Sequence, residues 1–257
     1  MKTKTRIAAL VSSLTLAALT TTAVAQEHPA AALAAKTVVL VHGAFADGSS
    51  WNKVIPFLEK AGLKVVAVQN SLDSLDGDVA VTNRAITAAQ GPVVLVGHSW
   101  AGAVISDAGV NDKVKSLVYV AAYAPDDGQS VFDSVKGYPQ MPGQASFVKD
   151  ADGYVKVSDA GVAKFFAPDL SPSEQKLIAA TQGALNIQAL GQPVPHAAWH
   201  KVPSFVVVAA NDQIISPQQQ RDQVKRLHAT AIEVPSSHVA MLAYPKAVAD
   251  LIIKAAE

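Results

Sequence analysis

The sequence predicts an α/β protein with a mostly parallel central sheet and helices on both faces of that sheet. Short Val-rich segments are apolar at successive positions, as strands buried on both faces require. Segments with helical periodicity separate them, and this alternation is typical of parallel sheets. Half of the 257 residues are hydrophobic and only 16% are charged, so one large core can form.

The expected elements follow one another regularly along most of the chain. Strands are predicted at 37–43, 64–70, 93–99, 116–122, 204–211 and 231–237. Helices are predicted near 51–61, 79–90, 101–110, 217–228 and 245–256. The core is therefore expected to comprise two stretches of chain, 37–124 and 203–257.

The interval between Pro125 and Pro203 breaks this rhythm. It is rich in Gly, Pro, Asp and Ser, with weak helical stretches at 159–166 and 172–190. A structureless loop of that length is uncommon inside a compact domain. We therefore predict that residues 125–202 form an inserted helical lid over the strand ends.

The first 25 residues have the three parts of a signal peptide. Lys2, Lys4 and Arg6 form a positively charged start, a largely apolar stretch follows, and a small-x-small cleavage site ends at Ala25. We expect export to the periplasm or the medium, with 26–36 as a linker. The apolar stretch is shorter than the roughly 20 residues of a membrane span, so no stable membrane anchor is expected.

Charge and cysteine content exclude several classes of function. Lys plus Arg and Asp plus Glu number 21 each, so no net charge favours binding to nucleic acid. The chain has no cysteine and therefore no disulfide, thiol nucleophile or cysteine-based metal site. No metal-ligand spacing such as H-E-x-x-H occurs, and neither a metal nor an organic cofactor is expected.

The segment "VVLVGHSWAG" at 93–102 indicates a reactive serine. A strand that enters a helix through a tight turn forces a strained backbone at the turn and needs small neighbours. Gly97 and Ala101 meet that need, and Ser99 would project from the carboxyl end of the strand, where open sheets bind ligands. The usual G-x-S-x-G pattern is modified, because Ala101 stands at its fifth position and Gly102 follows. A buried serine in an ordinary turn is the alternative.

A serine nucleophile needs a base and an acid that orients the base. Asp212 directly follows the strand 204–211, and His238 lies in the loop after the next strand. We predict that Ser99 is the nucleophile, His238 the base and Asp212 its orienting acid.

Other residues compete for these roles. Asp126 and Asp127 also follow a strand and could hold the imidazole, whereas Asn211 has no charge to stabilise an imidazolium. The remaining histidines have other expected positions: His98 points away from the serine and packs structurally, His228 ends a helix, and His196 and His200 lie in the predicted lid, where they could touch substrate.

Acyl transfer to a serine nucleophile also needs hydrogen-bond donors for the oxyanion that develops on the carbonyl oxygen. The loop after strand 37–43 can direct the Ala44 N–H toward the same point as the Trp100 N–H. His42 is expected to be a structural hydrogen-bonding residue beneath this loop. Phe45 either lines the pocket entrance or packs under the lid, and the sequence leaves both open.

Together these segments resemble the α/β-hydrolase superfamily, in particular its small lidded branch of bacterial esterases, plant methyl-salicylate-type esterases and hydroxynitrile lyases. The matching stretches are "VVLVHGAFADGSSW", "VVLVGHSWAG", "LVYVAAYAPDDGQS", "VVVAANDQIISPQQQ" and "EVPSSHVAMLAYPKAVADLI". The resemblance implies the same triad of Ser99, Asp212 and His238, with Ala44 and Trp100 as oxyanion donors. The predicted lid shows no comparable motif, so the resemblance does not define the substrate.

The resemblance also separates hydrolysis from related chemistry. Hydroxynitrile lyases of this type carry threonine where Gly43 stands and lysine where Val239 stands, and a serine at the turn differs from the aspartate of haloalkane dehalogenases. We expect a serine esterase that cleaves a small apolar or aromatic carboxylic ester through an acyl-enzyme. Amidase, lactonase and polyester hydrolase activity remain open, as does a hydrolase-like protein that only binds a ligand.

Overall fold

The computed structural model describes Met1 and residues 33–257. The predicted signal peptide and most of the predicted linker lie outside these residues. Among the described helices, none combines the length and the apolar character needed to cross a membrane.

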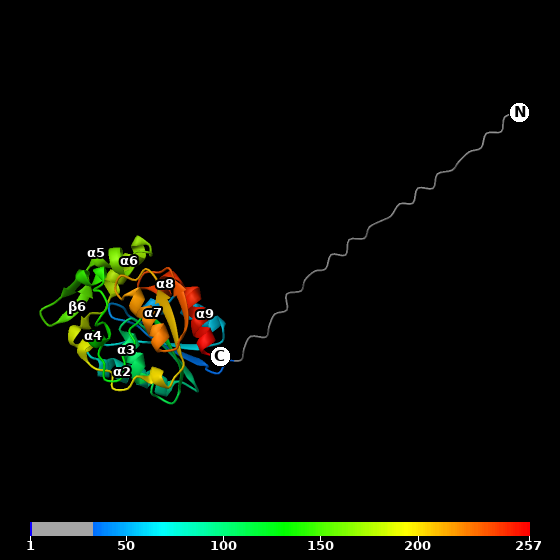
Figure 1. Cartoon of the computed structure of the whole chain (residues 1–257), viewed down its shortest axis with the longest axis horizontal. Coiled ribbons are helices and arrows are strands. Elements are labelled where there is room, and N and C mark those ends of the chain that lie inside the picture. The colour runs from blue at the N-terminus through cyan, green and yellow to red at the C-terminus, as the bar shows by residue number, and fades with distance from the viewer. Residues whose placement is uncertain (2–32) are drawn as a thin grey trace. The chain divides into compact units, whose positions relative to one another are not determined.

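A six-stranded parallel sheet forms the centre of the fold (Figure 1). The strands are β1 (Thr37–Val41), β2 (Lys64–Val68), β3 (Val93–His98), β4 (Val114–Val120), β8 (Ser204–Ala209) and β9 (Thr230–Val234). Their order is β2-β1-β3-β4-β8-β9, and every neighbouring pair is parallel. All residues of β1 and β3 are buried, as the continuous apolar runs require. The predicted fold class is confirmed.

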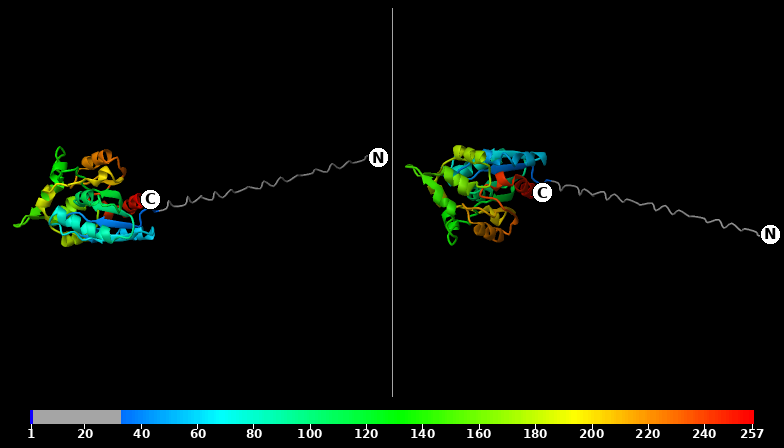
Figure 2. Two further views of the ribbon diagram at one scale, coloured as in Figure 1. Left: turned by 90° about the horizontal axis from the view of Figure 1, so that it is seen from below. Right: turned by 90° about the horizontal axis from the view of Figure 1, so that it is seen from above.

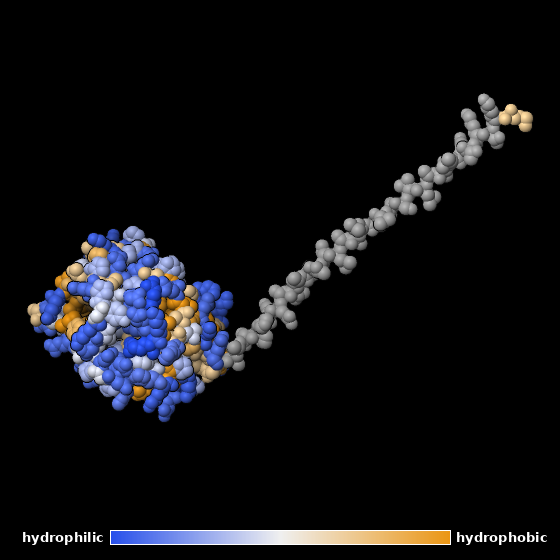
Figure 3. Space-filling model, viewed as in Figure 1, coloured by the Kyte–Doolittle hydropathy of each residue, from blue (hydrophilic) through white to orange (hydrophobic). Residues whose placement is uncertain are grey.

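Helices cover both faces of the sheet (Figure 2). They are α1 (Ile55–Lys60), α2 (Leu75–Ala88), α3 (Ala101–Ala108), α7 (Pro217–Arg226), α8 (Ala240–Ala243) and α9 (Pro245–Ala255), with a 3-10 turn η1 (Gly48–Trp51) before α1. α1 packs against α9, and α2 packs against α3. Hydrophilic residues dominate the face in Figure 3, with hydrophobic residues in smaller patches.

Residues 125–202, between β4 and β8, are called the inserted segment below. Its helices are α4 (Val131–Ser134), α5 (Asp159–Gly161), the π-helical turn η3 (Val162–Phe166), α6 (Pro172–Thr181) and the 3-10 turns η2 (Pro142–Ser146), η4 (Ile187–Gly191) and η5 (Ala198–His200). It also holds an antiparallel sheet of β5 (Phe147–Lys149), β6 (Tyr154–Val157) and β7 (Leu185–Asn186).

The helix predicted at 172–190 ends much earlier, at Thr181. Gln182 stops it, because its side-chain amide accepts from Val157 N at 2.8 Å and donates to Val157 O at 2.9 Å. The chain after Gln182 then pairs with β6 through β7. A long-range side-chain contact therefore overrides the local helical pattern.

Candidate active site

Ser99 lies at the turn between β3 and α3 with a backbone φ of 54°. This left-handed conformation is strained for a residue with a side chain. Small neighbours make it possible, since a Cβ at Gly97 would lie 2.6 Å from Ala101 O and one at Gly102 only 1.8 Å from Tyr123 O. The strained turn predicted for Ser99 is observed, and Gly102 proves as necessary to it as Gly97.

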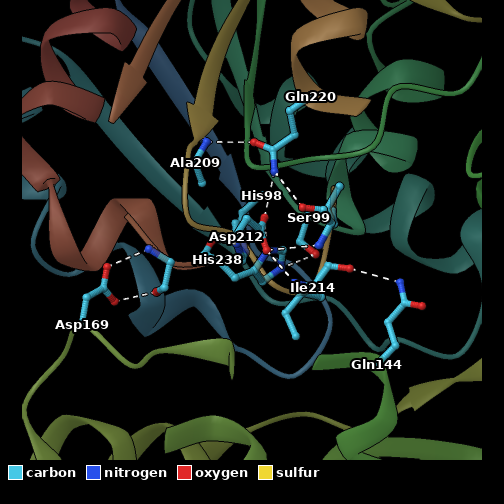
Figure 4. A network of polar contacts seen from close by, with 11 residues as sticks. His98, Ser99, Gln144, Asp169, Ala209, Asp212, Ile214, Gln220 and His238 are labelled. Atoms are coloured by element: carbon cyan, nitrogen blue, oxygen red, sulfur yellow. Dashed lines mark hydrogen bonds and ion pairs between the residues drawn. The ribbon is translucent and has the colours of Figure 1, made fainter. Parts of the chain in front are cut away.

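The structure brings Ser99, Asp212 and His238 together in one hydrogen-bonded line (Figure 4). His238 Nε2 lies 2.9 Å from Ser99 Oγ, and His238 Nδ1 lies 2.8 Å from Asp212 Oδ2. The three residues are at most 6% exposed. They follow β3, β8 and β9, whose carboxyl ends share one edge of the parallel sheet, so the fold itself juxtaposes them.

The partners of Asp212 define the tautomer of His238. Asp212 Oδ1 accepts from the N–H groups of Ile214 (2.8 Å) and Ile215 (3.1 Å), and Oδ2 accepts from Gln220 Nε2 (2.8 Å) as well as His238. A carboxylate only accepts hydrogen bonds, so His238 Nδ1 must donate. In the neutral imidazole, Nε2 then presents its lone pair to the Ser99 hydroxyl, as a general base must.

Gln220 is a site residue that the sequence analysis missed. It lies on α7, is fully buried, and accepts from Ala209 N–H at 2.9 Å through Oε1, which directs its Nε2 toward Asp212. The buried face of α7 carries Gln219, Gln220 and Gln223 instead of apolar residues. Hydrophobic periodicity therefore gave no sign that this face is buried.

The competing carboxylates are engaged elsewhere. Asp126 Oδ1 lies 2.6 Å from His200 Nε2, its Oδ2 lies 3.7 Å from Arg226 Nη1, and Asp127 accepts from Ala197 N–H. Ligand atoms of Asp126, Asp127 and His200 lie within 4.8 Å of one another. Because His200 and Arg226 already pair with Asp126 in this exposed cluster, its geometry is that of a surface ion-pair network.

His98 packs directly against His238. It donates from Nε2 to the His238 carbonyl oxygen at 3.0 Å, and the two ring centroids are 4.7 Å apart. Burial lowers the pKa of His98 well below its ordinary value, so the ring is neutral and its Nδ1 holds a lone pair. That atom has no hydrogen-bond partner within the described chain and would lie 2.9 Å from a Cβ at Gly43. The expected structural packing of His98 is observed, and it supports the His238 backbone.

His42 has the structural role expected of it. Its Nδ1–H donates to Gly43 O at 2.8 Å, and its Nε2 accepts from Asn70 N–H at 2.9 Å. Burial lowers the pKa of His42, which matches this neutral tautomer. His42 therefore ties the loop after β1 to the loop after β2.

Phe45 combines both roles that the sequence left open. Its N–H donates to Gly183 O of the inserted segment at 3.1 Å, and its ring packs 5.1 Å from Phe147 and 6.3 Å from Phe166, measured between centroids. The same residue also lines the cavity described below. Phe45 thus packs under the inserted segment and borders the pocket at once.

The backbone N–H groups of Ala44 and Trp100 differ from their neighbours because they have no hydrogen-bond acceptor in the described chain. The neighbouring backbone amides already donate hydrogen bonds: Phe45 N–H to Gly183 O, and Ser99 N–H to Val120 O. No acceptor for the Ala44 or Trp100 amide is found within residues 33–257. Both residues are buried; Trp100 follows Ser99 in the chain, and Gly43, which precedes Ala44, would place a Cβ 2.8 Å from Ser99 Cβ.

Asp78 holds the Trp100 side chain. The indole N–H donates to Asp78 Oδ2 at 2.9 Å, and Leu72 N–H donates to Asp78 Oδ1 at 3.0 Å. Burial raises the pKa of Asp78, and these hydrogen bonds oppose that rise. Sequence analysis did not single out Asp78, because an acidic residue in the first turn of α2 is also a common helix start.

A cavity of about 80 Å³ borders His98 and Val239, the residues next to Ser99 and His238 in the chain. Its walls are the loop after β1, His98, Phe166, α6 and the chain around α8. At one side Lys53 of the core forms an ion pair with Glu174 of α6, with 2.5 Å between nitrogen and oxygen. The cavity is therefore built jointly by the core and the inserted segment.

Comparison with known proteins identifies the family. Residues 38–251 match the model of the alpha/beta hydrolase family, and the chain belongs to it. Methylesterase 1 of Arabidopsis thaliana is 26% identical over 251 residues, which cover 85% of this chain and 95% of that protein. An alpha-hydroxynitrile lyase of the same plant is 30% identical over 120 residues, covering 41% of this chain and 46% of the lyase.

A solved structure shows the same fold. The pyrethroid hydrolase of Sphingobium faniae superposes with a TM-score of 0.75 at 22% identity, over 86% of this chain and 97% of that one. The resemblance to α/β-hydrolase esterases and their hydroxynitrile lyase relatives, drawn from the sequence, is confirmed.

Proposed function

We propose that this chain is a carboxylic ester hydrolase that cleaves a small apolar or aromatic ester through an acyl-enzyme on Ser99. The observation that carries the proposal is the continuous line of hydrogen bonds from Asp212 through His238 to the Ser99 hydroxyl. The esterase and hydrolase names of the relatives agree with it. No other function of this site is favoured by an observation.

The first half of the reaction forms the acyl-enzyme. Ser99 Oγ attacks the ester carbonyl carbon while His238 Nε2 takes the hydroxyl proton. The carbonyl oxygen becomes an oxyanion and accepts from the N–H groups of Ala44 and Trp100. The carbon to alkoxy oxygen bond then breaks, and His238 returns the proton to the departing alcohol.

The second half releases the acid. Water attacks the acyl-enzyme and gives its proton to His238 Nε2, and the same two amides hold the new oxyanion. The bond between the acyl carbon and Ser99 Oγ breaks, and His238 protonates Ser99 Oγ. Asp212 stabilises the imidazolium in both halves and keeps Nδ1 as the donor. The original Ser99 proton leaves with the alcohol and a proton from water replaces it, so Ser99 and His238 end in their starting protonation states.

The cavity supports a substrate of modest size with an apolar part. Phe45, Phe166, Ile178 and Leu242 contribute apolar wall, and the ion pair of Lys53 and Glu174 contributes polar wall. Burial of an apolar group contributes about 25 cal/mol per Å². An aromatic or aliphatic ester fits this environment better than a charged one.

Two positions argue against cyanide elimination. A side chain at Gly43 would begin 2.8 Å from Ser99 Cβ and 2.9 Å from His98 Nδ1, so the threonine of the lyases does not fit here without a shift. Val239 offers no ammonium to a departing cyanide. Hydrolysis is therefore the chemistry that these residues favour.

A substrate panel tests the proposal. Purified protein is assayed on p-nitrophenyl acetate, butyrate and benzoate, on the matching anilides, on a lactone and on a polyester film. We expect ester turnover that disappears in Ser99→Ala and persists in Ser173→Ala, a control at an exposed serine of α6. Activity on anilides with none on any ester contradicts the esterase assignment, and ligand binding without turnover of any compound contradicts an enzyme.

We also propose that the protein is exported after cleavage at Ala25. The charged start, the apolar stretch and the small residues before Gln26 support this. N-terminal sequencing of protein made by a bacterial host from the full reading frame is expected to begin at Gln26. A product that retains Met1 in the cytoplasm contradicts the proposal.

A further inference from the structure

Two side chains of the inserted segment contact the loop that carries His238. The Phe166 ring meets the imidazole edge to face, with 5.1 Å between centroids and 62° between planes. Asp169 binds Ser237, the residue directly before His238: Oδ2 accepts the Ser237 N–H at 2.7 Å and Oδ1 accepts the Ser237 hydroxyl at 2.5 Å (Figure 4). Phe166 is the last residue of η3, and Asp169 lies in the loop between η3 and α6.

The Asp169 contact fixes the backbone on one side of His238. Two donors of Ser237 meet both carboxylate oxygens, so the direction of the chain entering His238 is restrained, and hydrogen bonds to a charged acceptor are the stronger kind. On the other side, the His238 carbonyl accepts from His98 Nε2. The backbone is thus held from the inserted segment before His238 and from the core after it.

Asp169 has no direct part in the chemistry or in the cavity. Its carboxylate bonds to Ser237 only, among the hydrogen bonds of the described chain, and it is absent from the cavity wall that Phe166 and α6 form. Ser237 is 2% exposed with Asp169 in place, so its two donors face this carboxylate instead of bulk water. A change at Asp169 can reach the reaction only through the His238 loop.

We propose that Asp169 is a positioning residue: by holding Ser237 it sets the imidazole of His238 against Ser99 Oγ. The inserted segment thereby completes the catalytic geometry in addition to forming the cavity. This inference rests on the proposed serine hydrolase mechanism. A displacement of about 1 Å in a reacting group can lower a rate about 100-fold, so even a small relaxation of this loop has a measurable effect.

The first test compares kcat with KM in Asp169 variants. Asp169→Ala is expected to lower kcat at least about tenfold while KM stays within about twofold, because the cavity wall is unchanged. Asp169→Asn is expected to keep kcat within about threefold, since its oxygen can accept from Ser237 N–H and its nitrogen can donate to Ser237 Oγ. Asp152→Ala, in the turn between β5 and β6 of the same segment, is the control with unchanged kinetics.

The second test uses the rate at which a fluorophosphonate labels Ser99. This rate depends on activation of the hydroxyl by His238 and needs no ester substrate, so it remains informative if the proposed substrate class is wrong. Asp169→Ala and Ser237→Ala are each expected to slow labelling, and their effects are expected to overlap in the double variant. The Ser237 variant keeps the test open if Asp169→Ala does not fold.

Three results overturn the inference. One is a folded Asp169→Ala protein with wild-type kcat and labelling rate. Another is a rise in KM alone, which assigns Asp169 to substrate binding. The third is independent, additive effects of Asp169→Ala and Ser237→Ala on labelling, because a shared contact requires coupling.

Discussion

The core and the inserted segment both reach His238, but through different kinds of contact. The core binds the ring nitrogens, with buried Asp212 on Nδ1 and Ser99 on Nε2. The inserted segment contributes the ring of Phe166, which packs against the imidazole, and the exposed Asp169, which binds the residue before His238. The three residues of the proposed triad therefore follow strands of the core, whereas the inserted segment acts on the position of the His238 loop.

This difference predicts the largest loss of activity for Asp212→Asn. In this variant an NH₂ group replaces one of two oxygens that both accept hydrogen bonds. If the NH₂ faces the backbone N–H groups of Ile214 and Ile215, donor opposes donor; if it faces His238 Nδ1, it favours the imidazole tautomer in which Nδ1 is the acceptor. We expect kcat to fall about 10⁴-fold with the fold retained, measured on the best ester of the panel. Asp250→Asn, at an exposed position of α9, is the matched control. A loss below tenfold contradicts the role given to Asp212.

A smaller loss of activity is expected at Gln220, because this residue contacts Asp212 and not His238. Gln220→Leu removes one donor from Asp212 and leaves the Ala209 N–H without its acceptor. We expect kcat to fall about tenfold and the free energy of unfolding to fall by about 1–3 kcal/mol. Gln219→Leu is the control, because this buried neighbour bonds to Ser134 O instead. It should lose stability while kcat is retained, and equal kcat losses in both variants contradict the assignment.

His98, which packs against His238, is expected to make the free energy of unfolding depend on pH. The unfolded chain protonates His98 near its ordinary pKa of about 6.5, whereas the folded chain resists protonation because burial lowers the pKa. The unfolded state then binds more protons, so stability present above about pH 6.5 is lost as the pH falls. His98→Gln, which can still donate to the His238 carbonyl, should flatten this fall in urea unfolding between about pH 6.5 and 5. His42 has the same sign, so part of the slope remains, and an unchanged slope contradicts the prediction.

The ion pair of Lys53 and Glu174, which joins the core to the inserted segment, is expected to have the smallest effect on the free energy of unfolding. Lys53 lowers the pKa of Glu174 to about 2, but both side chains are more than a third exposed and water screens the pair. Lys53→Ala should lower the free energy of unfolding by less than about 1 kcal/mol, and less at high salt. Lys176→Ala on the same helix is the comparison. A loss of several kcal/mol would show that the pair, and not apolar packing, holds α6 on the core.

The sequence predicts the core well, because its signals are local and repeated. Apolar runs define the six strands of the parallel sheet, and Gly97 with Ser99 defines the turn after β3. Each predicted active-site residue follows a strand of that sheet, and parallel strands end at one edge. The order of the segments was therefore sufficient to predict which side chains meet.

The same approach missed contacts that depend on distant single partners. Asp169 and Ser237 are 68 positions apart, and neither lies in a periodic pattern. Gln220 lies on a polar buried face, and the short strands β5 to β7 have few buried residues to mark them. Such contacts depend on how the inserted segment lies on the core, which no local pattern specifies.

Labelling with a fluorophosphonate followed by peptide mapping tests the central claim most directly. The account predicts one labelled peptide that contains Ser99, with labelling lost in Ser99→Ala. Label on another residue, or no label on folded protein at neutral pH, contradicts the claim that Ser99 is an activated nucleophile.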